Sequence, residues 1–146
     1  MGKNIAIASD HAGFEMKEQL KHFLISIGYK VKDFGTNDSN SVDYPDYAHP
    51  LAESVEKGDF EFGFAFCGSG NGINMTVNKH QGIRSALCWM PEIARLARSH
   101  NNANICAIPA RFVTFEEVKQ IVTMFLNTDF EAGRHLTRIN KIPLKN

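Results

Sequence analysis

The sequence lacks an excess of charge of either sign, because 16 basic residues balance 16 acidic residues over 146 positions. Such a chain has no overall field that would attract nucleic acid or an anionic membrane, so any anionic ligand must be held by a local site. No apolar run approaches the roughly 20 residues that cross a bilayer. The segment from Met1 to Asp10 also lacks the apolar core of a signal peptide. We therefore expect no nucleic-acid partner and no membrane partner.

Cysteine is scarce as well. The three cysteines are an odd number and lie far apart, so they predict neither a disulfide framework nor a CxxC metal pair. A reducing cytoplasm is the simplest location for such a chain. The histidines show no H-x-x-x-H spacing and no mixed cluster with cysteine, so the sequence predicts no metal site. The cysteines are Cys67, Cys88 and Cys106, and the histidines are His11, His22, His49, His80, His100 and His135.

The residues that are present alternate between short apolar runs and amphipathic segments. This pattern is typical of right-handed βαβ units, which build a parallel sheet covered by helices on both faces. We expect one domain over residues 1–146, folded as a Rossmann-like three-layer α/β/α sandwich with a five-stranded parallel sheet and an extra C-terminal helix. The expected strands are 5–8, 29–34, 62–66, 84–88 and 104–108; the expected helices centre on 20–27, 47–55, 70–78, 93–100 and 115–125, with the last at about 130–140.

The carboxyl ends of the expected strands are where a site is predicted, because ligands of open parallel sheets bind beyond these ends. The first strand is followed by Asp10 and His11. The third leads into the segment C-G-S-G-N-G, from Cys67 to Gly72, and the fourth ends at Cys88.

The loop from Cys67 to Gly72 is the strongest local signal. Glycines let the backbone adopt positive φ and approach a ligand closely, and the free amides of a helix start can face an anion. A thiol in such a place suits a base or a nucleophile. The spacing matches neither the dinucleotide G-x-G-x-x-G nor a Walker loop. The alternative interpretation is a tight turn beside a buried cysteine.

Other candidate residues are weaker signals taken singly. Asp10 could be a ligand-binding carboxylate or a helix cap, and His11 beside it could bind phosphate or be solvated. His100 continues the apolar helix face of Ile93 and Ala97, and a histidine at a helix C-terminus is favourable for purely structural reasons.

Arg134 and Arg138 are four residues apart on the expected last helix. Like charges at that spacing repel by a few tenths of a kcal/mol, which a shared anion would relieve. The alternative is a solvated basic face. Gly133 inside that helix would cost about 1 kcal/mol relative to alanine, so it could mark a close approach.

The combination of motifs, in order along nearly the whole chain, resembles the ribose-5-phosphate isomerase B family. The wider family includes allose-6-phosphate isomerases and the subunits of galactose-6-phosphate isomerase. The motifs are I-A-I-A-S-D-H-A-G-F at 5–14, D-Y-P-D-Y-A at 43–48, C-G-S-G-N-G at 67–72, N-K at 78–79, G-I-R at 82–84, H-N-x-x-N at 100–104 and G-R-H-x-x-R at 133–138.

The resemblance implies roles for individual residues. Cys67 matches the base that moves a proton between C1 and C2, and His100 matches the group that opens the furanose ring. Some members use a glutamate after the glycine loop instead, but that position is Ile73 here. Independently of the matched positions, Tyr44 is expected to flank the sugar. The other matched binding positions are Asp10, His11, Gly68, Ser69, Gly70, Asn71, Gly72, Asn101, Arg111, Arg134 and Arg138, with the arginines around the phosphate.

The function implied is the interconversion of ribose 5-phosphate and ribulose 5-phosphate through an enediolate, in the pentose phosphate pathway and without a metal or other cofactor. The resemblance also implies a homodimer or a dimer of dimers, with the site shared between subunits. One alternative is isomerisation of allose 6-phosphate or galactose 6-phosphate. A different class is a non-enzymatic, flavodoxin-like or receiver-like phosphate-binding module. A receiver would need a phosphorylatable aspartate where Cys67 stands.

Overall fold

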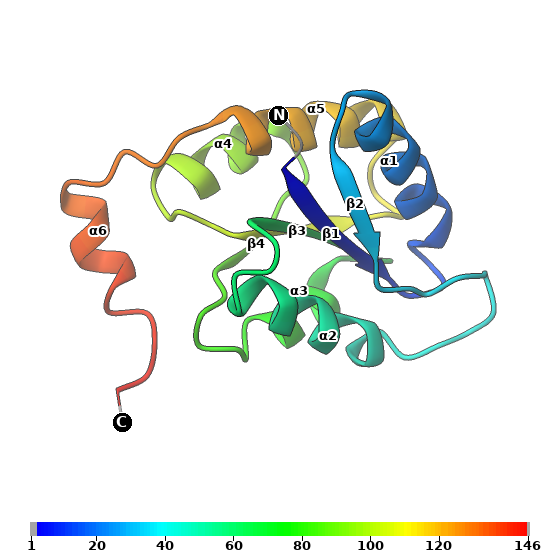
Figure 1. Cartoon of the computed structure of the whole chain (residues 1–146), viewed down its shortest axis with the longest axis horizontal. Helices are drawn as coiled ribbons and strands as arrows, with labels where there is room; N and C mark the ends of the chain where they lie inside the picture. The colour runs from blue at the N-terminus through cyan, green and yellow to red at the C-terminus, as the bar shows by residue number, and fades with distance from the viewer. Residues whose placement is uncertain (1–2, 146) are drawn as a thin grey trace.

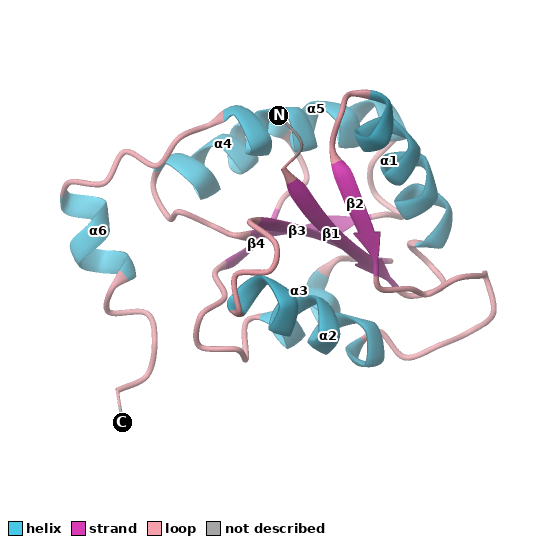
Figure 2. Cartoon of the chain, viewed as in Figure 1, coloured by secondary structure: helices cyan, strands magenta, loops and turns pink. Residues whose placement is uncertain are grey.

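The computed structural model describes residues 3–145 and contains a five-stranded, all-parallel sheet in the order β2-β1-β3-β5-β4. Helices lie on both faces of this sheet, so the predicted three-layer sandwich is confirmed (Figure 1, Figure 2). The strands are β1 (Asn4–Ser9), β2 (Lys30–Asp33), β3 (Phe62–Cys67), β4 (Ser85–Leu87) and β5 (Ile105–Pro109). The helices are α1 (Phe14–Ser26), α2 (Pro45–Glu56), α3 (Asn71–Val77), α4 (Pro91–Ser99), α5 (Phe115–Asn127) and α6 (Arg134–Ile139).

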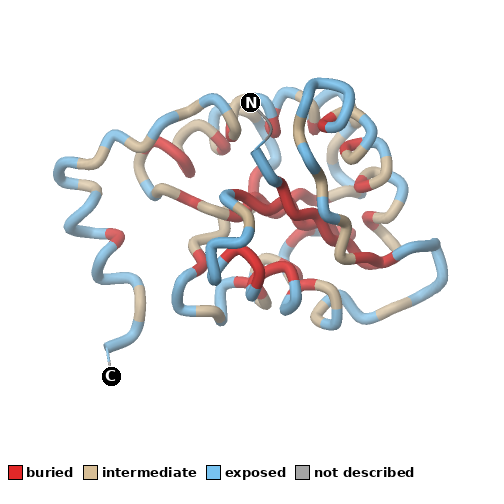
Figure 3. Tube along the Cα trace, viewed as in Figure 1, coloured by how far each residue is buried: buried red, intermediate tan, exposed pale blue. Residues whose placement is uncertain are grey.

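The two faces of the sheet differ in side-chain size. Helices α1, α4 and α5 cover one face, and α2 and α3 cover the other (Figure 1). Successive side chains of a strand point to opposite faces. Strand β3 therefore places Phe64 and Phe66 against the first layer, and Ala65 and Cys67 against the second. The central strands β1, β3 and β5 are the most deeply buried part of the chain (Figure 3). The thiol of Cys67 consequently lies on the side of α2 and α3.

Two glycines allow helix starts to approach the sheet closely. A Cβ on Gly13 would lie 2.5 Å from the Cβ of Phe66, so the start of α1 fits against β3 only without a side chain. Gly70 has a φ of 75°, and a Cβ there would overlap the side chain of Leu87. Glycine adopts this left-handed conformation without strain. Both approaches bring helix starts to the carboxyl ends of the strands.

A buried ammonium group connects α1 to the loop after β2. The side chain of Lys17 is completely buried, and its Nζ lies 2.6 Å from Oδ2 of Asp33. Asp33 also accepts a hydrogen bond from Lys21, at 3.1 Å, and its Oδ1 accepts one from the N–H of Gly35, at 2.9 Å. Burial raises the pKa of Asp33, but the hydrogen bonds from Lys17, Gly35 and Lys21 outweigh it and hold the pKa below its ordinary value. The loop after Gly35 is thereby fixed at its start.

The C-terminal helix differs from its prediction. It runs over Arg134–Ile139, not over about 130–140, and Gly133 is its N-cap residue, not an interior one. Gly133 has a φ of 58° and Ala132 a φ of 60°, and the N–H of Glu131 donates to the carbonyl of Ser99. Because positive φ is incompatible with a right-handed helix, the predicted start was wrong. Helix α6 projects from the body of the molecule (Figure 1).

Over residues 3–145, the structure contains no helix that is both long enough and apolar enough to cross a membrane.

We predict that Asp33→Asn lowers the free energy of unfolding at pH 7 by about 2 kcal/mol, because it removes the nearer of the two carboxylates that pair with the buried Lys17 ammonium and leaves Glu18, at 2.9 Å. The folded-state pKa of Asp33 is lowered, so its contribution is present above the unfolded-state pKa and is lost as pH falls through the folded value. Denaturant unfolding of both proteins at pH 7 and near pH 3 measures this. A stability difference that stays constant with pH would contradict the ion-pair account.

Candidate active site

A cavity of about 720 Å³ opens at the carboxyl edge of the sheet, between the segments that follow β1, β2, β3 and β5. This is the place that the strand ends predict. Its volume falls in the range of small-molecule sites. It is lined by Asp10, His11, Ala12, Ser41, Val42, Asp43, Tyr44, Cys67, Gly68, Ser69, Gly72, Arg111 and Phe112.

Cys67 is the last residue of β3 and is only 5% exposed. Its carbonyl accepts a hydrogen bond from the N–H of Ala110, and the carbonyl of Gly68 accepts one from the N–H of Arg111, each at 3.0 Å. These bonds hold the segments after β3 and β5 side by side. A Cβ on Gly68 would lie 3.1 Å from Nη1 of Arg111, so the arginine side chain crosses the glycine. A guanidinium is therefore held close to the thiol loop.

The rest of the glycine loop leads into α3. Oγ of Ser69 accepts a hydrogen bond from the N–H of Asn71 at 3.2 Å, and Gly70 supplies the left-handed residue before the helix. Gly72 lies against the ring of Tyr44, whose hydroxyl would be 2.7 Å from a Cβ at that position. Tyr44 is 37% exposed and stands at the cavity. The tyrosine can therefore contact a ligand placed over the glycine loop.

The side chain of Asp10 stabilises the turn that precedes α1. Its Oδ1 accepts hydrogen bonds from the N–H groups of Ala12, at 3.0 Å, and Gly13, at 3.2 Å, while its own N–H donates to the carbonyl of Phe66. The N-cap residue of α1 is Gly13, with no side-chain cap, so the expectation that Asp10 is the N-cap was wrong; its carboxylate instead binds amides of the turn before the helix. The carboxylate also borders the cavity, so these hydrogen bonds and ligand binding are compatible.

The hydrogen bond that the His11 imidazole accepts determines which of its nitrogens carries the proton. Its Nδ1 accepts a hydrogen bond from the N–H of Val42 at 3.1 Å, so that nitrogen carries no proton and Nε2 carries it in the neutral ring. The bond also fastens the loop before α2 to the first strand–helix junction. Asp43, in the same loop, borders the cavity and was not singled out by the sequence. Its position beside Tyr44 in the D-Y-P-D-Y-A motif was the available signal.

His100 lies at the opposite edge of the sheet. Cys67 pairs with Pro109, the last residue of β5, whereas His100 caps the end of α4, before β5 begins at Ile105. Strand β5 advances about 3.3 Å per residue, so its length alone separates the two edges by about 13 Å. Within one chain, the thiol and this imidazole therefore cannot act on the same atoms.

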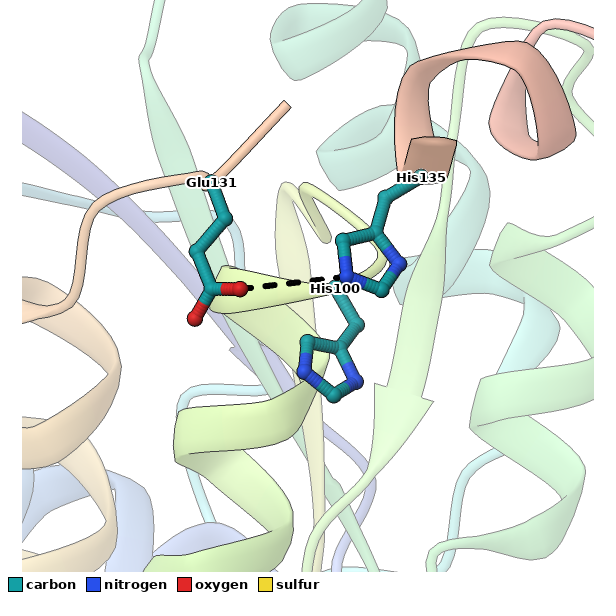
Figure 4. Close-up of side chains that lie close together, drawn as sticks. All are labelled: His100, Glu131 and His135. Carbon is teal, nitrogen blue, oxygen red and sulfur yellow. Dashed lines mark ion pairs between the residues drawn. The ribbon is translucent and has the colours of Figure 1, made fainter. Parts of the chain in front are cut away.

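The imidazole of His100 stacks on that of His135, with ring centroids 4.2 Å apart and an angle of 14° between the planes (Figure 4). Oε1 of Glu131 lies 3.8 Å from Nε2 of His135 (Figure 4). These residues have ligand atoms within 4.8 Å of one another and are chemically suited to zinc. A nitrogen lone pair lies in the plane of its ring, so two nearly parallel rings do not point at one ion. Their separation in sequence hid this group from spacing rules.

The turn after His100 is held by two buried or half-buried arginines. Nε of Arg84 donates to the carbonyl of Asn101 at 3.0 Å, and Nη2 donates to that of Asn102 at 2.9 Å. Nη1 of Arg98 donates to Oδ1 of Asn102 and to the carbonyl of Ala103. Burial lowers the pKa of both arginines, which still remain charged. Neither arginine was singled out by the sequence as a candidate for a role at the site.

The predicted site residues therefore fall into two groups. Asn101 borders a separate cavity of about 320 Å³, and Arg134 and Arg138 are exposed on α6. The group at the carboxyl edge comprises Asp10, His11, Tyr44, Cys67, Gly68, Ser69, Gly70, Asn71, Gly72 and Arg111. The group in the distant segments comprises His100, Asn101, Arg134 and Arg138.

Known proteins resemble this chain over nearly its whole length. A family model described as Ribose/Galactose Isomerase matches residues 5–142. Ribose-5-phosphate isomerase B of Escherichia coli is 40% identical over 140 residues, which cover 96% of this chain and 94% of the relative.

Solved structures agree with this similarity. Ribose 5-phosphate isomerase RpiB of Thermotoga maritima is 49% identical, with a TM-score of 0.96 and coverage of 98% of this chain and 99% of that one. Ribose-5-phosphate isomerase B of Mycoplasma genitalium, solved with bound ribulose-5-phosphate, is 42% identical, with a TM-score of 0.92 and coverage of 97% and 95%. The chain therefore belongs to the ribose/galactose isomerase family.

Proposed function

We propose that residues 1–146 form one isomerase domain that interconverts ribose 5-phosphate and ribulose 5-phosphate through an enediolate. The observation that carries this proposal is the place of Cys67, a thiol beside a glycine loop at the edge of a cavity of about 720 Å³. Relatives named ribose-5-phosphate isomerase B support the substrate, as does the ribulose-5-phosphate bound to the Mycoplasma genitalium protein.

Cys67 is the base. The proton on C2 of an aldose is weakly acidic, so its removal needs a positioned base and a stabilised enediolate. The thiolate takes the C2 proton and returns it to C1, while a second proton moves from O2 to O1. Amides of the loop from Gly68 to Gly72 stabilise the developing oxyanion, and the hydroxyl of Ser69 positions the end of the sugar. The protons balance in this sequence and no net electrons are gained or lost, so the step needs no redox cofactor.

The remaining groups of the cavity bind and orient the sugar phosphate. Asp10 accepts hydrogen bonds from sugar hydroxyls, Nε2 of His11 donates one, and Tyr44 flanks the sugar. Arg111, together with Arg134 and Arg138 of a second copy, surrounds the phosphate. Phosphate binding away from the reacting carbons holds C1 and C2 at the thiol, which is how remote binding energy lowers the barrier of a chemical step.

A second copy of the chain completes the site. His100 and Asn101 lie at the opposite edge of the sheet from Cys67, and α6 projects from the body with Leu136 45% exposed. A two-fold dimer in which each copy brings its α4–α6 end to the cavity of the other unites both groups, and symmetry makes two equal sites. His100 of the second copy then opens the furanose ring by moving a proton between the ring oxygen and the anomeric hydroxyl. The protein is a homodimer or a dimer of dimers.

The cellular setting follows from the reaction and the thiols. Interconversion of these pentose phosphates is a step of the pentose phosphate pathway. Cys67, Cys88 and Cys106 are all free thiols, which suits the reducing cytoplasm.

We predict that Cys67→Ala lowers kcat for ribose 5-phosphate by about 100- to 10,000-fold, the usual contribution of a positioned base. Steady-state kinetics of the purified variant measure this. Cys106→Ala is the matched control, since that thiol is buried in β5 away from the cavity. The control should keep kcat near that of the wild type. Near-normal isomerisation by Cys67→Ala would sink the assignment.

A shared site predicts complementation between two inactive chains. A mixed dimer of Cys67→Ala and His100→Asn has both native residues at one of its two sites, so the purified mixed dimer should show about half of the wild-type activity. The chains are co-expressed with different tags, and the doubly tagged fraction is assayed. Mixing Cys67→Ala with the Cys67→Ala/His100→Asn double variant is the control and should restore nothing. Failure of the first mixture to recover activity would contradict site sharing.

We predict that kcat/KM for ribose 5-phosphate exceeds that for allose 6-phosphate and galactose 6-phosphate by about tenfold or more, since one extra carbon in a fitted pocket is worth 10- to 200-fold. Parallel rate measurements on the three sugar phosphates test this. A six-carbon sugar phosphate as the best substrate would shift the assignment to the allose or galactose branch of the family.

A further inference from the structure

We propose that His135, supported by Glu131, is the positioning residue that holds the His100 imidazole in the orientation needed to open the sugar ring. This inference rests on the proposed function, in which His100 performs ring opening. In this proposal His135 acts by positioning His100 and does not itself contact the reacting atoms.

The contact between the two rings is of a kind that fixes orientation. Their centroids are 4.2 Å apart and their planes differ by 14°, so one face of His100 is covered by His135 (Figure 4). An imidazole rotates easily about the bond that joins it to Cβ, because that torsion is broad. Packing against one face restricts this rotation and fixes the plane in which both ring nitrogens lie. Ring opening needs a nitrogen in the plane that contains the ring oxygen, so the stack holds the imidazole ready for that contact.

The backbone between the two histidines is built to bring them together. The N–H of Glu131 donates to the carbonyl of Ser99 at 3.0 Å, which ties the incoming chain to the residue before His100. Ala132 and Gly133 then take positive φ values and turn the chain into α6. Positive φ at an alanine is uncommon and persists only where surrounding contacts require it. The turn places His135 on the first α6 turn, over His100.

The charges around His135 favour its neutral form. Burial lowers the pKa of His135, and His100, Arg134 and Arg138 lower it further, while Glu131 acts in the opposite direction. Glu131 is itself near Arg95, so its negative charge is partly offset. A neutral His135 can remain stacked whether His100 is neutral or protonated. A cationic His135 would repel the imidazolium that His100 forms when it accepts a proton.

The same three side chains could instead bind a transition-metal ion, and the geometry disfavours this. The rings of His100 and His135 present their faces to each other, whereas metal binding uses a lone pair at the ring edge. The positive charges of Arg134 and Arg138 nearby also oppose the binding of a metal cation. Metal binding is therefore an outcome that the experiment must distinguish, and one that would overturn the proposal.

The experiment separates ring opening from enolisation. Ribulose 5-phosphate has no furanose form, because its C5 oxygen carries the phosphate. Exchange of its C1 proton with D2O, followed by proton NMR, therefore reports the Cys67 half of the reaction without ring chemistry. Conversion of ribose 5-phosphate reports both halves. The variants are His135→Ala, which removes the stacked ring, and His135→Phe, which keeps an aromatic ring at that position. The control is His22→Ala, which changes an exposed histidine on α1.

We expect His135→Ala to lower conversion of ribose 5-phosphate by roughly tenfold, in the range seen when a supporting partner is lost, and to raise the ratio of exchange to conversion by a similar factor. His135→Phe should restore most of the conversion, and His22→Ala should match the wild type. The exchange signal also shows that the His135→Ala protein is folded and assembled.

Three results would overturn the inference. His135→Ala could convert ribose 5-phosphate normally, His135→Phe could be as impaired as His135→Ala, or the wild type could lose ring opening on EDTA treatment and regain it with Zn²⁺. His100→Asn is measured in parallel. If His100→Asn raises the ratio of exchange to conversion and His135→Ala does not, only this inference fails. If His100→Asn converts ribose 5-phosphate normally, the proposed role of His100 fails, and this inference with it.

Discussion

In an all-parallel sheet, each strand carries the chain to the carboxyl edge and each helix carries it back. Residues that follow strands therefore gather at one edge, and residues that end helices gather at the other. Cys67 ends a strand and His100 ends a helix, so this constraint places them on opposite sides of the same sheet. The proposed division of the candidate site between two copies follows from this topology. The projecting α6 is the element that extends the second group beyond the body of its own chain.

The same sheet determines how closely the glycine loop is held. Bulky side chains of β3 fill the layer of three helices, while alanine and cysteine face the layer of two. The start of α3 can then fit between β4 and β5, where Gly70 avoids the side chain of Leu87. The buried ammonium group of Lys17 stabilises the loop after β2. It pairs with Asp33, and Asp33 accepts a hydrogen bond from the backbone N–H of Gly35. The loop that carries Tyr44 is thus anchored at both ends, with Val42 bonded to His11.

Prediction succeeded where the local pattern was strong. The run from Phe62 to Phe66 is apolar on both faces, and only a strand buried from both sides satisfies that pattern. The strand ends then located the cavity, because Asp10 and Cys67 follow neighbouring strands. Prediction failed at α6, where Arg134 and Arg138 suggested a longer helix. The turn at Ala132 depends on the bond between Glu131 and Ser99, which joins residues 32 positions apart and leaves no mark in the local sequence.

The sequence by itself determined the fold class, the family and the identity of the groups that can do chemistry, because hydrophobic periodicity and motif order are local properties of the chain. It also placed a thiol, a glycine loop and an aspartate at strand ends. Only the tertiary structure decided which of these groups meet. It put His100 at the far edge from Cys67, stacked His135 on His100, and held the intervening turn with Arg84 and Arg98. Such contacts depend on how distant segments pack, and packing is set by the whole chain.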